Sequence, residues 1–136
     1  MSQDAVTRDV GGWALFLDVD GTILEIAETP HGVRVPESLK DLLNTLSVRL
    51  DSALALISGR TLDDLDRLFM PLRLTAAGVH GAERRETSGC VARPSIDPRR
   101  LDEARDVLAD FVSWHPKLIL EDKSCALALH FRRIPH

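Results

Sequence analysis

Short apolar segments alternate with longer amphipathic ones between residues 13 and 79. Apolar runs at residues 13–17 and 53–57 and a third predicted strand at residues 74–79 are separated by two stretches in which apolar residues recur at helical spacing. The first run has no polar position, which is typical of a strand covered on both faces. Strand, helix, strand, helix, strand in this order predicts a parallel sheet with right-handed crossovers.

Both predicted helices have recognisable ends. Pro36 suits a first helical position, and Thr61 with Asp64 resembles a capping box at the start of the second helix, which Pro71 ends. The leucines expected to form the apolar face of the first helix are Leu39, Leu42, Leu43, Leu46 and Leu50. Each helix is therefore predicted to have one apolar face.

The pattern changes after His80. Residues 82–93 are polar and predict a hairpin that turns at Ser88-Gly89. Asp97 is expected to cap a further helix. This helix and two strands are predicted at residues 98–114, 117–121 and 125–131. The second block is interpreted as a small α/β layer inserted after the third strand, which divides the chain into residues 1–80 and 81–136.

Composition indicates one globular domain with a substantial core. The 136 residues are 44% apolar and 28% charged, with a net charge of −4. Acids and bases are interleaved, so we expect no basic face for nucleic acid. No apolar run is longer than that at residues 13–17, which cannot span a bilayer, and residues 1–10 lack the apolar core of a secretory signal. Cys90 and Cys125 are expected to be reduced thiols of a cytoplasmic protein.

The motif Asp18-Val19-Asp20-Gly21-Thr22 directly follows the first apolar run. Ligand sites of open α/β sheets lie beyond the carboxyl ends of the strands, where these acids fall. Carboxylate and carbonyl oxygens suit Mg²⁺, which also takes a substrate phosphate oxygen as a ligand. Asp18 would then attack phosphorus as a nucleophile, and Asp20 would protonate the leaving oxygen and later activate water.

Two other interpretations of these acids are weaker. Acids in loops often only cap a turn, but an apolar strand that runs into D-x-D-G-T is far rarer than a bare D-x-D. An EF-hand loop also begins with D-x-D, yet it needs a preceding helix and a glycine at its sixth position. Here a strand precedes and Gly21 is the fourth residue, so calcium binding is rejected.

Ser58-Gly59-Arg60 follows the second apolar run. The Ser58 hydroxyl can hydrogen-bond a phosphoryl oxygen, and Gly59 permits close approach of the backbone. The N-terminus of the next helix also favours an anion. An ordinary turn is the alternative, and Arg60 either contacts the substrate or supports the start of the helix.

The other polar residues carry weaker signals. No pair of histidines has metal-ligand spacing, so surface or packing roles are expected for His31, His80, His115, His130 and His136. Arg84-Arg85 is expected on a solvated face. Taken alone, Glu121-Asp122-Lys123 is a polar turn without function.

Together these motifs resemble the haloacid dehalogenase-like phosphatases and, within them, the trehalose-6-phosphate phosphatases. The resemblance covers nearly all of residues 13–132. It is carried by LDVDGT (17–22), IAETPHGVRVP (26–36), ISGR (57–60), GVHGAE (78–83) and EDKSCALALHFR (121–132). It implies an α/β fold: a Rossmannoid parallel sheet represented by its first three core strands in residues 1–80, with part of an inserted α/β cap in residues 81–136.

For the core, the resemblance implies that Asp18 is the nucleophile and a metal ligand. Asp20 would be the acid/base and would give Mg²⁺ its backbone carbonyl, while Ser58 would hold the phosphoryl group. The substrate would also contact the residues beside these, namely Val19, Gly59 and Arg60.

For the cap, the resemblance implies that Glu121 and Lys123 contact the sugar, whose hydroxyls need several hydrogen bonds. The implied reaction is the Mg²⁺-dependent hydrolysis of trehalose 6-phosphate through an aspartyl-phosphate. A phosphatase of another sugar phosphate and a non-catalytic remnant that only binds are the alternatives.

The sequence departs from the family pattern in one respect. The family has a lysine motif and an acidic motif after the cap, and neither occurs up to His136. A truncated chain, or a fragment completed by a partner, would explain this. The first strand would then lie at a sheet edge that favours self-association, and the 136-residue chain is expected to turn over little substrate.

Overall fold

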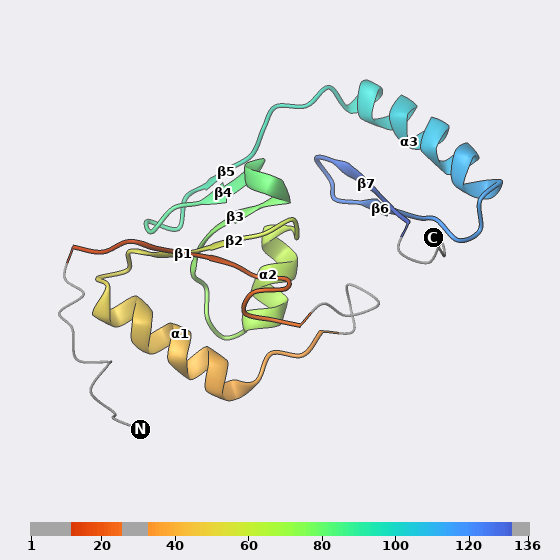
Figure 1. The fold of residues 1–136 in the computed structure, drawn as a ribbon. Helices are drawn as coiled ribbons and strands as arrows, with labels where there is room; N and C mark the ends of the chain where they lie inside the picture. Colours follow the sequence, from red (N-terminus) through yellow and green to blue (C-terminus); the bar gives the residue numbers. More distant parts are fainter. Residues whose placement is uncertain (1–11, 26–32, 132–136) are drawn as a thin grey trace. The chain divides into compact units, whose positions relative to one another are not determined.

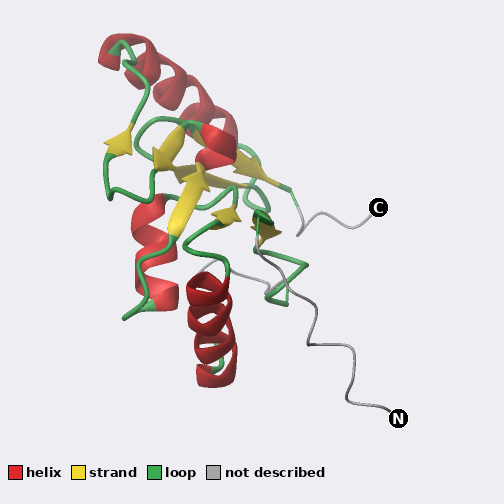
Figure 2. Ribbon diagram, turned by 90° about the vertical axis from the view of Figure 1, so that its left-hand side faces the viewer, coloured by secondary structure: helices red, strands yellow, loops and turns green. Residues whose placement is uncertain are grey.

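The computed structural model describes residues 12–25 and 33–131. The chain forms two compact units, one ending at Val91 and the other beginning at Ala92. In both units the strands are short, and the helices are the longest regular elements (Figures 1 and 2).

A five-stranded sheet forms the frame of the first unit, in the order β1-β2-β3-β4-β5. Its strands are β1 Leu15–Asp18, β2 Leu54–Ile57, β3 Thr75–Gly78, β4 Glu83–Arg85 and β5 Val91–Ala92. The first three are parallel, as predicted, and β4 runs antiparallel to β3. Asp18 pairs in register with Ile57, so β1 and β2 end side by side.

Helices α1 (Glu37–Arg49) and α2 (Leu62–Phe69) cover one side of this sheet (Figure 1). The buried apolar residues between helices and sheet are Val19, Leu24, Leu43, Leu50, Leu54, Leu56, Leu62, Leu65, Phe69, Leu74 and Ala76. Most of the predicted leucine face of α1 packs here, but the prediction is wrong for Leu42, which is exposed. Pro36 is the N-cap of α1 rather than its first residue.

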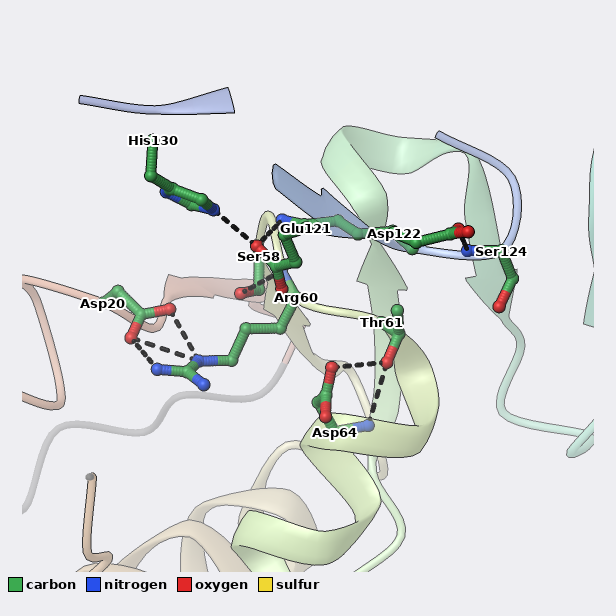
Figure 3. Close-up of polar contacts among 10 residues, drawn as sticks. Asp20, Ser58, Arg60, Thr61, Asp64, Glu121, Asp122, Ser124 and His130 are labelled. Carbon is green, nitrogen blue, oxygen red and sulfur yellow. Dashed lines mark hydrogen bonds and ion pairs between the residues drawn. The ribbon is translucent and has the colours of Figure 1, made fainter. Parts of the chain in front are cut away.

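The Thr61 cap predicted for α2 is confirmed, with a hydroxyl–carboxylate contact to Asp64 in place of the second bond of a capping box. The Thr61 hydroxyl oxygen accepts a hydrogen bond from the Asp64 N–H at 3.1 Å, and the hydroxyl donates to the Asp64 carboxylate at 2.7 Å (Figure 3). One of the backbone donors left open at a helix start is thereby satisfied. The cap determines where α2 begins, directly after Ser58-Gly59-Arg60.

β1 lies at the open edge of the sheet, as expected from the family pattern. Leu15 and Leu17 pack against the core, whereas Phe16, on the other face, is 68% exposed. The prediction that this strand is covered on both faces is therefore wrong for the described residues. The described helices of the first unit cover only one face of the sheet, and period-two alternation directs Phe16 to the other.

The hairpin predicted at residues 82–93 is present and continues the sheet of the first unit. Glu86 N–H donates to the Cys90 carbonyl at 2.9 Å, and Gly89 has the positive φ of +85° that the turn requires. Because β4 pairs with β3, the first unit extends to Val91. The division into a phosphatase core at residues 1–80 and a cap at 81–136 stays a prediction.

The two arginines of β4 face opposite sides. Arg84 is exposed as expected, but Arg85 is buried, and its guanidinium donates to the Leu74 carbonyl and pairs with Asp66. The prediction of a solvated face is wrong for Arg85, since alternate residues of a strand point to opposite faces.

The second unit contains α3 (Pro98–Ser113), β6 (Ile119–Asp122) and β7 (Leu127–His130), which confirms the three predicted elements. Asp97 caps α3 as predicted, because its carboxylate accepts the Arg99 N–H at 3.0 Å. α3 has no buried residue, and β6 and β7 form an antiparallel pair. None of the helices in the described ranges has the length and apolar character that a bilayer crossing needs.

Candidate active site

The loop after β1 is held by its own backbone. Gly21, with φ of +89°, donates its N–H to the Leu24 carbonyl at 2.7 Å, and Leu24 N–H donates to the Val19 carbonyl at 2.9 Å. Val19 is fully buried and anchors the loop in the core. Asp20 therefore leaves the sheet on a short, closed turn that glycine makes possible.

Asp18 and Ser58 lie at neighbouring strand ends. Asp18 is exposed, and its carboxylate accepts the Thr22 hydroxyl at 2.8 Å. Ser58 directly follows Ile57, the register partner of Asp18, and is buried. Its oxygen accepts the Arg60 N–H at 3.1 Å, so its own hydrogen remains available for an acceptor. The two motifs therefore lie at neighbouring ends of β1 and β2, as the parallel strand order predicts.

Arg60 forms a forked ion pair with Asp20 (Figure 3). Its Nε lies 2.9 Å from Asp20 Oδ2 and 3.1 Å from Oδ1, and its second terminal nitrogen lies 2.6 Å from Oδ1. The side chains are 13% and 34% exposed, respectively. This contact was not predicted, because the residues around Arg60 in the sequence suggest only the substrate and the helix start as its partners.

The turn after β3 holds the serine loop, Ser58-Gly59-Arg60, in place. Val79 N–H donates to the Arg60 carbonyl at 2.8 Å, and His80 N–H donates to the Ser58 carbonyl at 3.1 Å. Val79 and His80 adopt positive φ values of 49° and 54°. A β-branched residue rarely adopts this conformation, so the backbone here is strained, which is common beside functional sites.

Glu83 completes this support from β4. It is buried, and its carboxylate accepts the Leu62 N–H, at the start of α2, at 2.8 Å. Gly78 leaves no room for a side chain, since a Cβ would lie 2.8 Å from the Arg60 carbonyl oxygen. No role was predicted for Glu83, although it lies in the stretch GVHGAE, which contributes to the family resemblance.

In the second unit, Glu121, Lys123 and His130 form a polar cluster. The Glu121 carboxylate lies 2.6 Å from His130 Nε2 and 3.5 Å from the Lys123 ammonium (Figure 3 draws the former contact). The structure thus brings together the two predicted sugar-binding residues and adds His130, for which only a surface or packing role was expected. His115, in contrast, packs against the Phe111 ring, while His31 and His136 lie outside the described residues.

Asp122 is directed into its own turn rather than into this cluster. The Ser124 backbone N–H, at 2.9 Å, and the Arg105 guanidinium, at 2.7 Å, hold the pKa of the Asp122 carboxyl below its ordinary value. Both contacts favour the charged form. The turn between β6 and β7 is thereby held by a carboxylate, and we assign Asp122 to structure.

Within the described ranges, no group of three or more His, Cys, Asp or Glu side chains is placed to hold a metal ion. Asp18 offers an exposed carboxylate, whereas Arg60 engages both oxygens of Asp20. A cation here would therefore take the carboxylate of Asp18 and the backbone carbonyl of Asp20, with water completing its shell. Such an oxygen set suits Mg²⁺, which usually keeps several waters.

The predicted α/β fold is confirmed by similarity to solved structures. The chain matches a trehalose-6-phosphate phosphatase related protein with a TM-score of 0.71 and 26% identity, covering 87% of this chain and 51% of that one. It matches the C-terminal domain of C. albicans trehalose-6-phosphate phosphatase with a TM-score of 0.73 and 25% identity, covering 88% and 42% of the two chains.

The chain belongs to the trehalose-phosphatase family, whose model matches residues 16–136. It is 48% identical over 133 residues to a probable trehalose-phosphate phosphatase of Sinorhizobium fredii, covering 96% of this chain and 49% of the relative. It is 40% identical over 123 residues to the trehalose-6-phosphate phosphatase of Escherichia coli, covering 90% and 46%. The chain spans about half the length of these curated relatives.

Proposed function

We propose that this protein takes part in the Mg²⁺-dependent hydrolysis of trehalose 6-phosphate to trehalose and phosphate. The observation that carries the proposal is the exposed Asp18 carboxylate at the end of β1, in register with the residue before Ser58. Membership of the trehalose-phosphatase family supports this substrate.

In the proposed reaction, a carboxylate oxygen of Asp18 bonds to phosphorus while the bond from phosphorus to the sugar oxygen breaks. The Ser58 hydroxyl donates a hydrogen bond to a phosphoryl oxygen, and Asp20 gives its proton to the leaving sugar oxygen. Asp20 then takes a proton from water, which attacks phosphorus and releases phosphate from Asp18. Val19 and Gly59 would line the phosphate through their backbone.

The Asp18 carboxylate and the Asp20 carbonyl would hold Mg²⁺. When bound, Mg²⁺ offsets the negative charges that Asp18 and the phosphate bring together. The Thr22 hydroxyl, 2.8 Å from Asp18, orients the carboxylate without neutralising it.

The trehalose portion would be recognised by Glu121 and Lys123. A carboxylate and an ammonium supply acceptors and donors for sugar hydroxyls, and His130 fixes the orientation of Glu121 at 2.6 Å. We also propose the cytoplasm as the place of action, because Cys90 and Cys125 are too few and too far apart in the sequence for a disulfide framework.

The test is phosphate release from a panel of sugar phosphates, with Mg²⁺ and with a chelator. We expect trehalose 6-phosphate to have the highest kcat/KM and Asp18→Asn to lower turnover by about 10³-fold or more, because the nucleophile is lost. Asp41→Asn, which removes an exposed acid from α1, is the matched control and should leave turnover unchanged.

Glu121→Gln sharpens the assignment of the sugar site. It should raise KM for trehalose 6-phosphate and leave KM for p-nitrophenyl phosphate, which has no sugar, unchanged. A better substrate among the other sugar phosphates would overturn the trehalose assignment. Turnover that survives Asp18→Asn, or turnover that does not depend on Mg²⁺, would overturn the reaction itself.

A further inference from the structure

We infer that Arg60 is a positioning residue that holds the Asp20 carboxylate for proton transfer, an inference that rests on the proposed function. The guanidinium contacts both oxygens of Asp20, at 2.6 to 3.1 Å, across 40 residues of sequence. A two-pronged contact determines both the place and the rotation of a carboxylate, which a single hydrogen bond does not.

The backbone of Arg60 is held as firmly as its side chain. Its N–H donates to the Ser58 hydroxyl oxygen at 3.1 Å, and its carbonyl accepts the Val79 N–H at 2.8 Å. Gly78 packs directly beneath this carbonyl. Arg60 therefore connects the serine loop, the strained turn after β3 and the loop after β1 that carries Asp20. The position of the Asp20 side chain depends on all three segments.

Proton transfer makes this arrangement useful. A general acid or base must lie within hydrogen-bond reach of the proton it moves, and the side chain of Asp20 is only partly buried on a loop. The arginine holds both oxygens of the Asp20 carboxylate in one orientation, and this carboxylate must take a proton from water in the second half of the reaction. Loss of the contact between the Arg60 guanidinium and the Asp20 carboxylate should slow the release of phosphate from Asp18 more than the transfer of phosphate to Asp18.

The test compares wild type, Arg60→Gln and Arg60→Lys with p-nitrophenyl phosphate, whose leaving group needs no proton. We expect Arg60→Gln to lower kcat by about tenfold or more while kcat/KM changes by less than about twofold. Phosphate should accumulate on Asp18, so a burst of about one nitrophenolate per site should precede steady state. Arg60→Lys keeps the positive charge but cannot contact both carboxylate oxygens in the same way. It should therefore lower kcat less than Arg60→Gln does, again with a burst.

A double variant and a matched control complete the design. Asp20→Asn combined with Arg60→Gln should be no slower than Asp20→Asn alone, because Arg60 acts only through Asp20. Arg67→Gln removes an exposed arginine of α2 that pairs with Asp64, and should leave both kcat and the burst unchanged.

Three results would overturn the inference. A parallel fall in kcat and kcat/KM would mean that Arg60 contacts the phosphate itself. A further loss in the double variant would mean that Arg60 acts independently of Asp20. Phosphate release that survives Asp18→Asn would instead overturn the proposed function, and the inference with it.

Discussion

Ser58 in the first unit and Glu121 in the second carry polar atoms proposed for the same substrate, but their surroundings differ. Ser58 is buried on a loop held by His80, in a unit whose core includes the fully buried Phe69. Glu121 is half-buried on a two-stranded sheet whose neighbouring helix, α3, has no buried residue. Atoms that react need a rigid frame, whereas sugar hydroxyls can be met by side chains that adjust.

The largest difference should be in how much stability is lost when a phenylalanine is removed from each unit. Phe69 is 1% exposed and Phe111 of α3 is 47% exposed. We expect Phe69→Ala to lower the free energy of unfolding by about 3 to 5 kcal/mol, because it leaves a cavity, and Phe111→Ala by less than about 1 kcal/mol. Urea unfolding followed by far-ultraviolet circular dichroism measures both. Equal losses would show that α3 is as well packed as α2.

A medium effect should come from the glycines around the serine loop. In Gly78→Ala the Cβ would meet the Arg60 carbonyl oxygen at 2.8 Å, and backbone cannot move aside cheaply. We expect a loss of about 1 to 3 kcal/mol in the free energy of unfolding, together with reduced turnover. In Gly59→Ala the Cβ would meet the exposed His80 ring, also at 2.8 Å, and the ring can rotate away.

Gly59→Ala should therefore cost less than about 1 kcal/mol in the same unfolding measurement. A larger loss for Gly59→Ala than for Gly78→Ala would contradict the view that the turn after β3 holds the loop through backbone contacts.

The smallest effect should come from Asp122 in the second unit. Its pKa is lowered from 3.8, first by the Ser124 N–H and then by Arg105, so it stabilises the fold above pH 3.8. This contribution is lost as pH falls through the lowered pKa. Because Asp122 is largely exposed, Asp122→Asn should cost less than about 1 kcal/mol at neutral pH.

The measurement for Asp122 is thermal unfolding of wild type and variant between pH 2 and 7. The difference in Tm should shrink below pH 3.8 and disappear at the lowest pH. Asp110→Asn on α3 is the matched control. A difference that grows on acidification would contradict the assigned role.

Local signals in the sequence were sufficient for most of the elements. Apolar runs predicted β1, β2 and β3, and capping residues such as Thr61 and Asp97 predicted where helices begin. These signals act over a few residues, so they can be read without knowing the fold. They could not place Arg85 or Leu42, whose burial depends on what lies opposite them.

The sequence by itself determined that Asp18 and Asp20 follow a strand, that Ser58 follows the next one, and that both motifs belong to a phosphatase pattern. Only the tertiary structure decided that Arg60 joins Asp20 across 40 residues and that Glu83 supports the start of α2. The physical reason is the separation along the sequence of the residues that interact. Periodicity and caps depend on neighbours along the chain, whereas these contacts arise from strand order and register, which bring distant residues to one end of the sheet.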